Sequence, residues 1–189
     1  MNQLPSFIRR SLDGTLIGSL SDHGFLLRLL EVREAHRLSE LAVRLNQNKK
    51  KGKSLYDAWM FKESDAIQGL SQAYADRVIF QACIERLKTC EKEIQTSLSE
   101  LVTLTAIDWI EKDLGWFLSK KVISAKMGRK VSDNARALCE KIAPNALDLI
   151  EAFGIPDYMR HAPIAGDWIG YNKTDNFGEL LPEMQNQSK

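Results

Sequence analysis

The chain has 189 residues, of which 44% are hydrophobic, so it is long enough to bury the core of one folded domain. Twenty-six basic and twenty-five acidic side chains leave a formal net charge of +1, a balance that argues against broad contact with nucleic acid or an anionic membrane. No apolar run approaches the roughly 18 residues of a membrane span, and residues 1–14 lack the apolar core of a signal peptide.

The first predicted elements are a linker or short helix and a long helix. Residues 1–20 contain one proline and two glycines, which favour a loop or a short helix. Ser21 or Asp22 then suits the N-cap of an amphipathic helix over residues 22–47. Its apolar side is predicted to consist of Leu30, Leu38, Leu41, Ala42 and Leu45, with Glu31, Arg33, Glu34, Arg37 and Glu40 elsewhere.

The segment NQNKKKGK (46–53) is polar and basic and contains a glycine. We interpret it as a solvated loop between helices in preference to a localisation signal. Helical periodicity resumes at Ser54 and continues to Cys90, with Ser64 as the point where this helix could break. The apolar face predicted for it is Ile67, Leu70, Tyr74, Val78 and Ala82.

Further helices are predicted for residues 91–119 and 124–142 from apolar residues recurring every three or four positions. Pro144 suits the first turn of a shorter helix that extends to Phe153, and Gly154 suits the position beyond its end. No segment shows the sustained alternation of a strand, and no internal repeat is visible.

The predicted fold class is therefore all-α, an antiparallel bundle of about four long helices with short C-terminal helices. The segment that follows Gly154 is rich in proline and glycine yet still carries apolar side chains. We expect it to be a loop that closes the open end of the bundle and is restricted by its prolines. The side chains predicted to lie on apolar surface are Ile155, Ile164, Trp168 and Tyr171.

Motifs that carry chemistry are absent from the sequence. There is no GxGxxG after a strand, P-loop, HExxH or GxSxG. His36 and Glu40 have the spacing of a surface pair or half a metal site, and without a second ligand set the pair is the preferred interpretation. His23 and His161 could contact a ligand, but a surface or loop role is preferred for both.

Two further groups of reactive residue types stand out. Asp108, Glu111 and Asp113 lie among Trp109, Trp116 and Phe117, and carboxylates among aromatics can act as acids or bases. Nearby lysines are equally available as partners, so we assign no catalytic residue and no metal ligand. The three cysteines, which have no CxxC spacing, are interpreted as reduced intracellular thiols, with Cys83 and Cys90 in core packing: Cys83, Cys90 and Cys139.

Three blocks in this order carry a family resemblance: SLSDHGFLLRLLEVRE, DWIEKDLGWFL and LDLIEAFGIPDYMRHAPIAGDW. Together they resemble the C-terminal helical domain of acyl-CoA oxidases, over roughly residues 15–172. The last block is the most specific, because AF-x-IPD followed by APIAGDW is not a generic helical pattern. The resemblance implies a domain over residues 21–172, preceded by a linker (1–20) from a missing N-terminal part and followed by a polar tail (173–189).

The resemblance also implies a reaction. In that family FAD accepts a hydride from the β-carbon of an acyl-CoA, a glutamate removes the α-proton, and oxygen reoxidises the flavin to give hydrogen peroxide. The flavin domain and the glutamate region precede the part matched here and have no counterpart in residues 1–189. No catalytic residue is carried over, the cofactor-binding residues are unknown, and we expect this chain alone not to bind FAD.

Partners and location follow from the same resemblance. The expected partner is a full-length oxidase subunit or a separate N-terminal half, in a homo- or heterodimer. A fragment, a truncated isoform, half of a split enzyme and a stand-alone interaction module all remain open. A eukaryotic member would be peroxisomal and a bacterial one cytoplasmic, although this chain ends at Gln187-Ser188-Lys189, one leucine short of the Ser-Lys-Leu import signal.

Overall fold

The computed structural model describes residues 15–160, 162, 166 and 168–174, and every regular element among them is helical. The predicted all-α class is confirmed. None of the described helices is long and apolar enough to cross a membrane. The chain divides into two compact units, residues 1–144 and 145–189, which are described separately.

The longest helix is α2 (His23–Lys50). The carboxylate of Asp22, its predicted N-cap, accepts a hydrogen bond of 2.9 Å from the Gly24 N–H. The predicted loop of residues 46–53 is wrong in its first half, because α2 continues to Lys50. Asparagine, glutamine and lysine cost a helix little, and the helix ends only where Gly52 adopts a positive φ of 77°.

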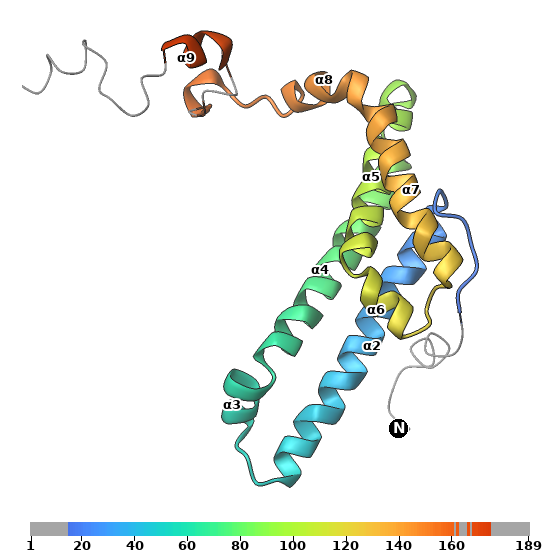
Figure 1. Cartoon of the computed structure of the whole chain (residues 1–189), viewed down its shortest axis with the longest axis vertical. Coiled ribbons are helices and arrows are strands. Elements are labelled where there is room, and N and C mark those ends of the chain that lie inside the picture. The colour runs from blue at the N-terminus through green and yellow to red at the C-terminus, as the bar shows by residue number, and fades with distance from the viewer. Residues whose placement is uncertain (1–14, 161, 163–165, 167, 175–189) are drawn as a thin grey trace, which may run out of the picture. The chain divides into compact units, whose positions relative to one another are not determined.

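The chain then reverses through residues 51–53 into α3 (Leu55–Asp57), a π-helical turn η1 (Ala58–Lys62) and α4 (Ser64–Leu87). Ser54 caps α3 by accepting a hydrogen bond from the Asp57 N–H. The break considered near Ser64 is confirmed. Helices α2 and α4 run antiparallel and pack against each other, with α3 at the far end of this hairpin (Figure 1).

The single helix predicted for residues 91–119 is two helices, α5 (Lys92–Lys112) and α6 (Leu114–Ser119). Asp113 ends the first and begins the second. Helix α7 (Ala125–Ile142) agrees with the predicted range of residues 124–142. The Ser124 hydroxyl caps it by accepting a hydrogen bond from the Met127 N–H at 3.1 Å. Helices α5 and α7 pack against each other in antiparallel directions, so Glu100 near the start of α5 meets Lys141 at the end of α7.

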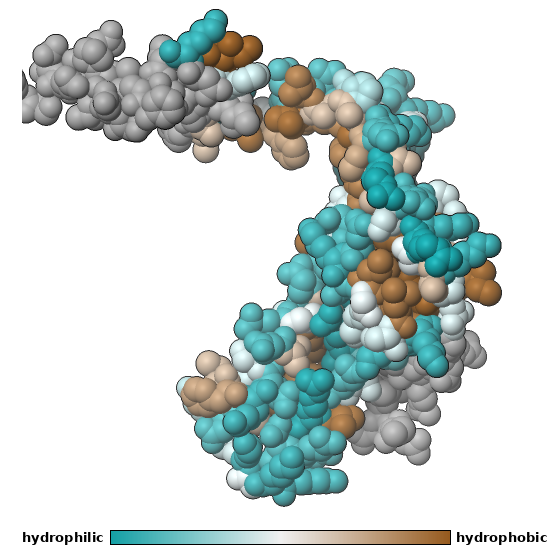
Figure 2. All heavy atoms as spheres, viewed as in Figure 1, coloured by the Kyte–Doolittle hydropathy of each residue, from teal (hydrophilic) through white to brown (hydrophobic). Residues whose placement is uncertain are grey.

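The core of the first unit is formed where these helices meet. Its buried members come from all of the long helices and from the segments before α2 and α7: Leu20, Phe25, Leu26, Leu29, Leu30, Val32, Phe80, Ala106, Ile107, Ile110, Phe117, Val122, Ile123 and Val131. Figure 2 shows that hydrophilic side chains cover most of the visible face of these helices.

The buried faces of α2 and α4 differ from those predicted. Leu38 and Ala42 of α2 are exposed, as are Tyr74 and Val78 of α4. Conversely, Arg33 and Asp76 are buried at 2% exposure each. The buried faces were predicted wrongly for two reasons. Apolar residues occur on more than one side of each helix, and the inward face includes an ion pair that a hydrophobicity pattern scores as polar.

The segment before α2 is tied to the loop that joins α6 to α7. The Leu16 N–H donates to the Val122 carbonyl at 2.8 Å, and the Thr15 hydroxyl donates to the Lys121 carbonyl at 3.0 Å. Lys121 adopts a left-handed φ of 57°. These bonds join residues more than a hundred positions apart in the sequence.

The second unit begins with α8 (Ala146–Glu151), after the 3-10 turn η2 (Ala143–Asn145), and continues with the 3-10 turn η3 (Asp157–Met159) and α9 (Trp168–Thr174). Gly154 adopts a φ of 62° just beyond the end of α8, as expected for a helix stop. Helix α9 replaces part of the predicted loop. Ile155 and Trp168 are each about half-exposed, and the covering of the bundle by this segment stays a prediction.

Candidate functional site

A partly buried ion-pair network links α2, α4 and the α5–α6 junction. Arg33 donates to the Asp76 carboxylate at 2.5 Å and to the Asp113 carboxylate at 2.9 Å. Arg37, one turn further along α2, donates to the same Asp113 oxygen at 2.9 Å. Gln72 completes the network by donating to the other oxygen of Asp76 at 2.6 Å. Two guanidinium groups therefore face two carboxylates; the Arg33–Asp76 pair is buried, whereas the side chains of Arg37 and Asp113 are 23% and 30% exposed.

This network answers the question of whether Asp113 could act as an acid or base. Two guanidinium groups bind one oxygen of its carboxylate in charge-assisted hydrogen bonds. Its position at the break between α5 and α6 fixes that junction to α2. We therefore assign Asp113 a structural role, with Asp76 as the partner that the sequence did not reveal. The available signal was an aspartate on the same helical face as Ala73 and Phe80.

The remaining residues of the acidic set are placed apart from this network. Asp108 pairs with Lys112 at 2.6 Å on the exposed side of α5, and Glu111 is half-buried. Of the neighbouring aromatics, Phe117 belongs to the core, and Trp116 meets it edge to face at a centroid distance of 5.1 Å. The carboxylates predicted as an alternative catalytic set are not brought together around one point.

His36 lies half-buried on α2, with its ring edge to face against Trp116 at 5.6 Å. Burial lowers the pKa of His36 below its ordinary value, with Lys120 acting in the same direction and Glu40 opposing it. Glu40 itself pairs with Lys120. Among the described residues no group of three histidine, cysteine or acidic side chains could hold a metal ion.

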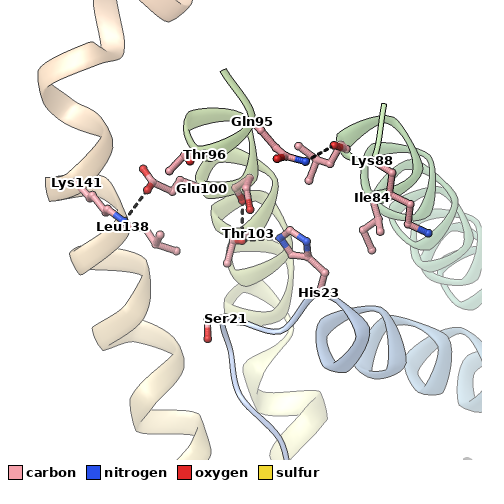
Figure 3. A pocket seen from close by; sticks show the side chains of 12 residues that line it. Ser21, His23, Ile84, Lys88, Gln95, Thr96, Glu100, Thr103, Leu138 and Lys141 are labelled. Atoms are coloured by element: carbon pink, nitrogen blue, oxygen red, sulfur yellow. Dashed lines mark hydrogen bonds and ion pairs between the residues drawn. The ribbon is translucent and has the colours of Figure 1, made fainter. Parts of the chain in front are cut away.

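A cavity of about 580 Å³ in the first unit lies between the start of α2, the end of α4, the first half of α5 and the end of α7 (Figure 3). Its apolar lining is Ile84, Leu87 and Leu138. Its polar lining surrounds these: Ser21, His23, Lys88, Gln95, Thr96, Ser99, Glu100, Thr103 and Lys141. The cavity is therefore a mixed polar and apolar hollow at the end of the unit where four helices meet.

His23 is the feature of this cavity that sequence analysis assigned to a surface role. Its Nε2 lies 2.9 Å from the Thr103 hydroxyl, and its ring meets Phe80 edge to face at 5.9 Å. Thr103 in turn donates to the Ser99 carbonyl at 2.7 Å. His23 thus joins the start of α2 to α5 and faces the cavity (Figure 3).

The remaining candidate residues, His161 and the three cysteines, are not assigned to a functional site. His161 lies outside the described residues. Cys83, Cys90 and Cys139 are free thiols, the first two half-buried and the third exposed. The cavity supplies hydrogen-bonding groups, and its charged groups include Glu100 and Lys141, which pair at 2.6 Å. We find no nucleophile, base and oxyanion donor converging on one point among its lining residues.

Comparison with known proteins gives a consistent family. The acyl-CoA oxidase family model matches residues 22–167. The chain is 26% identical over 155 residues to acyl-coenzyme A oxidase 2, peroxisomal, of Arabidopsis thaliana, and 28% identical over 145 residues to an acyl-coenzyme A oxidase-like protein of Mus musculus. These matches cover 82% and 75% of this chain but only 22% and 23% of those proteins.

Solved structures agree in fold. Acyl-CoA oxidase 3 from Yarrowia lipolytica superposes with a TM-score of 0.73 at 20% identity, over 95% of this chain and 28% of that one. Acyl-CoA oxidase-1 from Caenorhabditis elegans, in a structure complexed with FAD and ATP, gives 0.73 at 18% identity over 97% and 30% of the two chains. With the family model matching most of its length, the chain belongs to the acyl-CoA oxidase family.

Proposed function

We propose that this chain is the C-terminal helical domain of an FAD-dependent acyl-CoA oxidase of fatty-acid β-oxidation. The overall reaction converts acyl-CoA and O2 into trans-2-enoyl-CoA and H2O2. The observation that carries the proposal is the family match over residues 22–167. Since the chain spans less than a quarter of its curated relatives, the reaction requires a catalytic part supplied by a longer polypeptide or by a separate subunit.

The role of this chain in the reaction is to support that catalytic part. Of the carboxylates considered for catalysis, Asp113 forms ion pairs with Arg33 and Arg37, and Asp108 is paired with Lys112 on the surface. In oxidases of this class a glutamate removes the substrate proton, and we assign that group to the part outside this chain. The partner is a full-length oxidase subunit or a separate N-terminal half, in a homo- or heterodimer.

The described residues do not fit FAD as a complete site. FAD carries a pyrophosphate, which proteins commonly bind at a glycine-rich turn that opens a helix. None of the twelve residues that line the cavity beside His23 is a glycine. Its Lys141 is already paired with Glu100. We therefore place FAD, which accepts a hydride from the acyl-CoA, with the catalytic part.

The proposed location is the peroxisome if the chain is eukaryotic, since the matched Arabidopsis relatives are named as peroxisomal. A bacterial member would be cytoplasmic. Fluorescence microscopy of the tagged chain in its own cells, with a peroxisomal marker, tests this assignment. Diffuse fluorescence in a eukaryotic cell would contradict it.

The central experiment purifies the tagged chain from its own cells and, separately, after expression alone. We expect the sample from its own cells to contain a larger flavoprotein that absorbs near 450 nm and releases peroxide with palmitoyl-CoA. The chain expressed alone should be colourless and release no peroxide above a no-protein control, with FAD supplied. Flavin colour and peroxide release by the chain alone would refute the assignment of the catalytic groups.

A second candidate function is a non-catalytic interaction or dimerisation module derived from an oxidase. It is favoured by the absence of a converging catalytic set in the described part of the chain. The same purification separates the two candidates. If the chain purified from its own cells has no bound partner, is colourless and is inactive, the result would support the interaction module and contradict a role in oxidation.

A further inference from the structure

The tip of the hairpin formed by α2 and α4 combines exposed apolar side chains with a local excess of lysine. We propose that this tip attaches the protein to an anionic phospholipid surface. The inference concerns a different part of the molecule from the cavity and does not depend on the oxidase assignment. We call the apolar group the tip patch, which consists of Leu55, Tyr56, Trp59, Met60 and Phe61.

The tip patch is exposed on α3 and η1. Leu55 is 71% exposed, Phe61 68% and Trp59 44%, and the rings of Tyr56 and Phe61 meet edge to face at 6.0 Å. Within residues 55–62, Ala58 is the buried member. The hydrophobic atoms near α3 in Figure 2 lie beside hydrophilic ones. This turn therefore presents its large apolar residues outward.

Lysines flank the tip patch in the sequence. Five of them lie between residues 49 and 62: Lys49, Lys50, Lys51, Lys53 and Lys62. The same stretch, extended to residue 63, contains two acidic residues, Asp57 and Glu63, so five minus two leaves a local charge of +3. The whole-chain charge of +1, which argues against broad contact with an anionic surface, does not describe this local excess.

Both acidic residues are engaged within the hairpin. The Asp57 carboxylate accepts from the Ser54 hydroxyl at 2.7 Å. The Glu63 side chain is only 11% exposed, accepts from the Asn48 amide at 2.9 Å and lies 3.7 Å from Arg44. The exposed charge at the tip is consequently dominated by the lysines.

A groove of about 350 Å³ is lined by both apolar and lysine side chains of the hairpin tip. It is lined by Leu45, Leu55 and Ala58 together with Lys49 and Lys53, so apolar walls and ammonium groups border the same hollow. Lysine chains can lay their methylene stems on apolar surface and keep the charged end in water. Lysines beside tryptophan, phenylalanine and leucine form the composition that binds the interface of a bilayer.

The combination of aromatic residues and lysines favours a lipid surface over a protein as the partner that binds the tip patch. Protein interfaces are enriched in aromatic residues but depleted in lysine, whereas an anionic bilayer attracts each lysine that lies near its surface. Since no described helix could span a bilayer, the attachment we propose is peripheral. The aromatic side chains enter the headgroup region and the lysines contact lipid phosphates.

The test is sedimentation of the whole chain with vesicles of phosphatidylcholine alone or mixed with phosphatidylserine. We expect binding to the mixed vesicles that is at least tenfold tighter than to phosphatidylcholine and weakens with added salt. Replacing both Lys49 and Lys53 by alanine should weaken binding about tenfold or more. The matched control replaces Lys126 and Lys130, which are exposed on α7, and should bind like the wild type.

Brominated lipid reports the apolar part of the contact. Bromine on the acyl chains should quench part of the tryptophan fluorescence of the bound protein, and Trp59→Phe should bind normally but lose that quenching. Trp168→Phe is the control and should keep it. Circular dichroism of each variant shows whether it is folded, and these conservative changes lie at exposed positions.

Three results would overturn the proposal. The first is no binding to either kind of vesicle at low salt. The second is binding that the Lys49 and Lys53 substitutions leave unchanged while the Lys126 and Lys130 control abolishes it. The third is a chain that does not bind vesicles but self-associates in sedimentation equilibrium, and that becomes monomeric when Trp59 and Phe61 are replaced by serine. That result would make the tip patch a contact between copies of the chain.

Discussion

The Arg33 guanidinium lies 2.5 Å from the Asp76 carboxylate, and the two side chains are only 2% and 3% exposed. Removing two charges from water costs several kcal/mol each, which their attraction and further hydrogen bonds must offset. Gln72 and Asp113 supply those bonds. The pair therefore fixes how α4 sits against α2 more than it adds net stability.

We expect Asp76→Ala to lower the free energy of unfolding by about 3 to 5 kcal/mol, because it leaves the Arg33 charge buried with less compensation. Urea denaturation followed by circular dichroism measures this. The control is Asp108→Ala, which breaks an exposed pair with Lys112 and should cost less than about 1 kcal/mol.

A double replacement tests the reason for that loss. Arg33→Met combined with Asp76→Leu removes both charges and should be less destabilised than Asp76→Ala alone. If the single substitution unfolds at the same urea concentration as the wild type, the buried charge is better solvated than the geometry indicates.

Gly18 gives a prediction about close packing. A Cβ at this position would lie 2.2 Å from Cδ2 of Phe25, a core residue. We expect Gly18→Ala to cost about 1 to 3 kcal/mol through displacement of that ring. Gly115→Ala is the control, since its Cβ would meet no atom within 4 Å and alanine stabilises a helix by about 1 kcal/mol relative to glycine. Equal thermal stability of the two variants would contradict this account.

His36 gives a prediction about pH. Its pKa in the folded chain is lowered by burial, so the unfolded chain takes up this proton at a higher pH than the folded one. The contribution of His36 to stability is therefore complete above its ordinary pKa of about 6.5 and is lost as pH falls from there through its lowered folded pKa. His36→Gln should reduce the fall in melting temperature between about pH 7 and pH 5. An identical fall in both proteins would show that His36 does not contribute to it.

Trp168→Ala tests the prediction that the segment after Gly154 covers the apolar end of the helices. If it does, the substitution should cost about 3 to 5 kcal/mol, as expected for a truncated core aromatic. Ile17→Ala is a useful comparison, because Ile17 is 92% exposed and should change little. A melting temperature unaffected by Trp168→Ala would show that the segment is peripheral.

The sequence was most informative where local rules decide the structure. Asp22 caps α2 as predicted, the helices predicted to begin at residues 54 and 124 each start after a capping serine, and Gly154 marks a helix end. These signals act over a few residues and need no knowledge of the fold. The family resemblance was likewise carried by short blocks in order, and the family model confirms it.

The sequence was least informative where a tertiary contact overrides the local pattern. Arg33 looks like a surface residue until Asp76 and Asp113 are placed beside it. His23 could not be assigned to a cavity, because Thr103 lies 80 positions away. The exposed Tyr74 and Val78 were predicted as core because periodicity identifies an apolar face without stating what it contacts.

The bonds from Thr15 and Leu16 to Lys121 and Val122 have a consequence for the order of folding. The hairpin of α2 and α4 can form from nearby residues, whereas these bonds need a loop of about a hundred residues to close first. During synthesis they cannot form until the α6–α7 loop has left the ribosome. In pulsed hydrogen exchange, the Leu16 amide should therefore gain protection after the amides of α2.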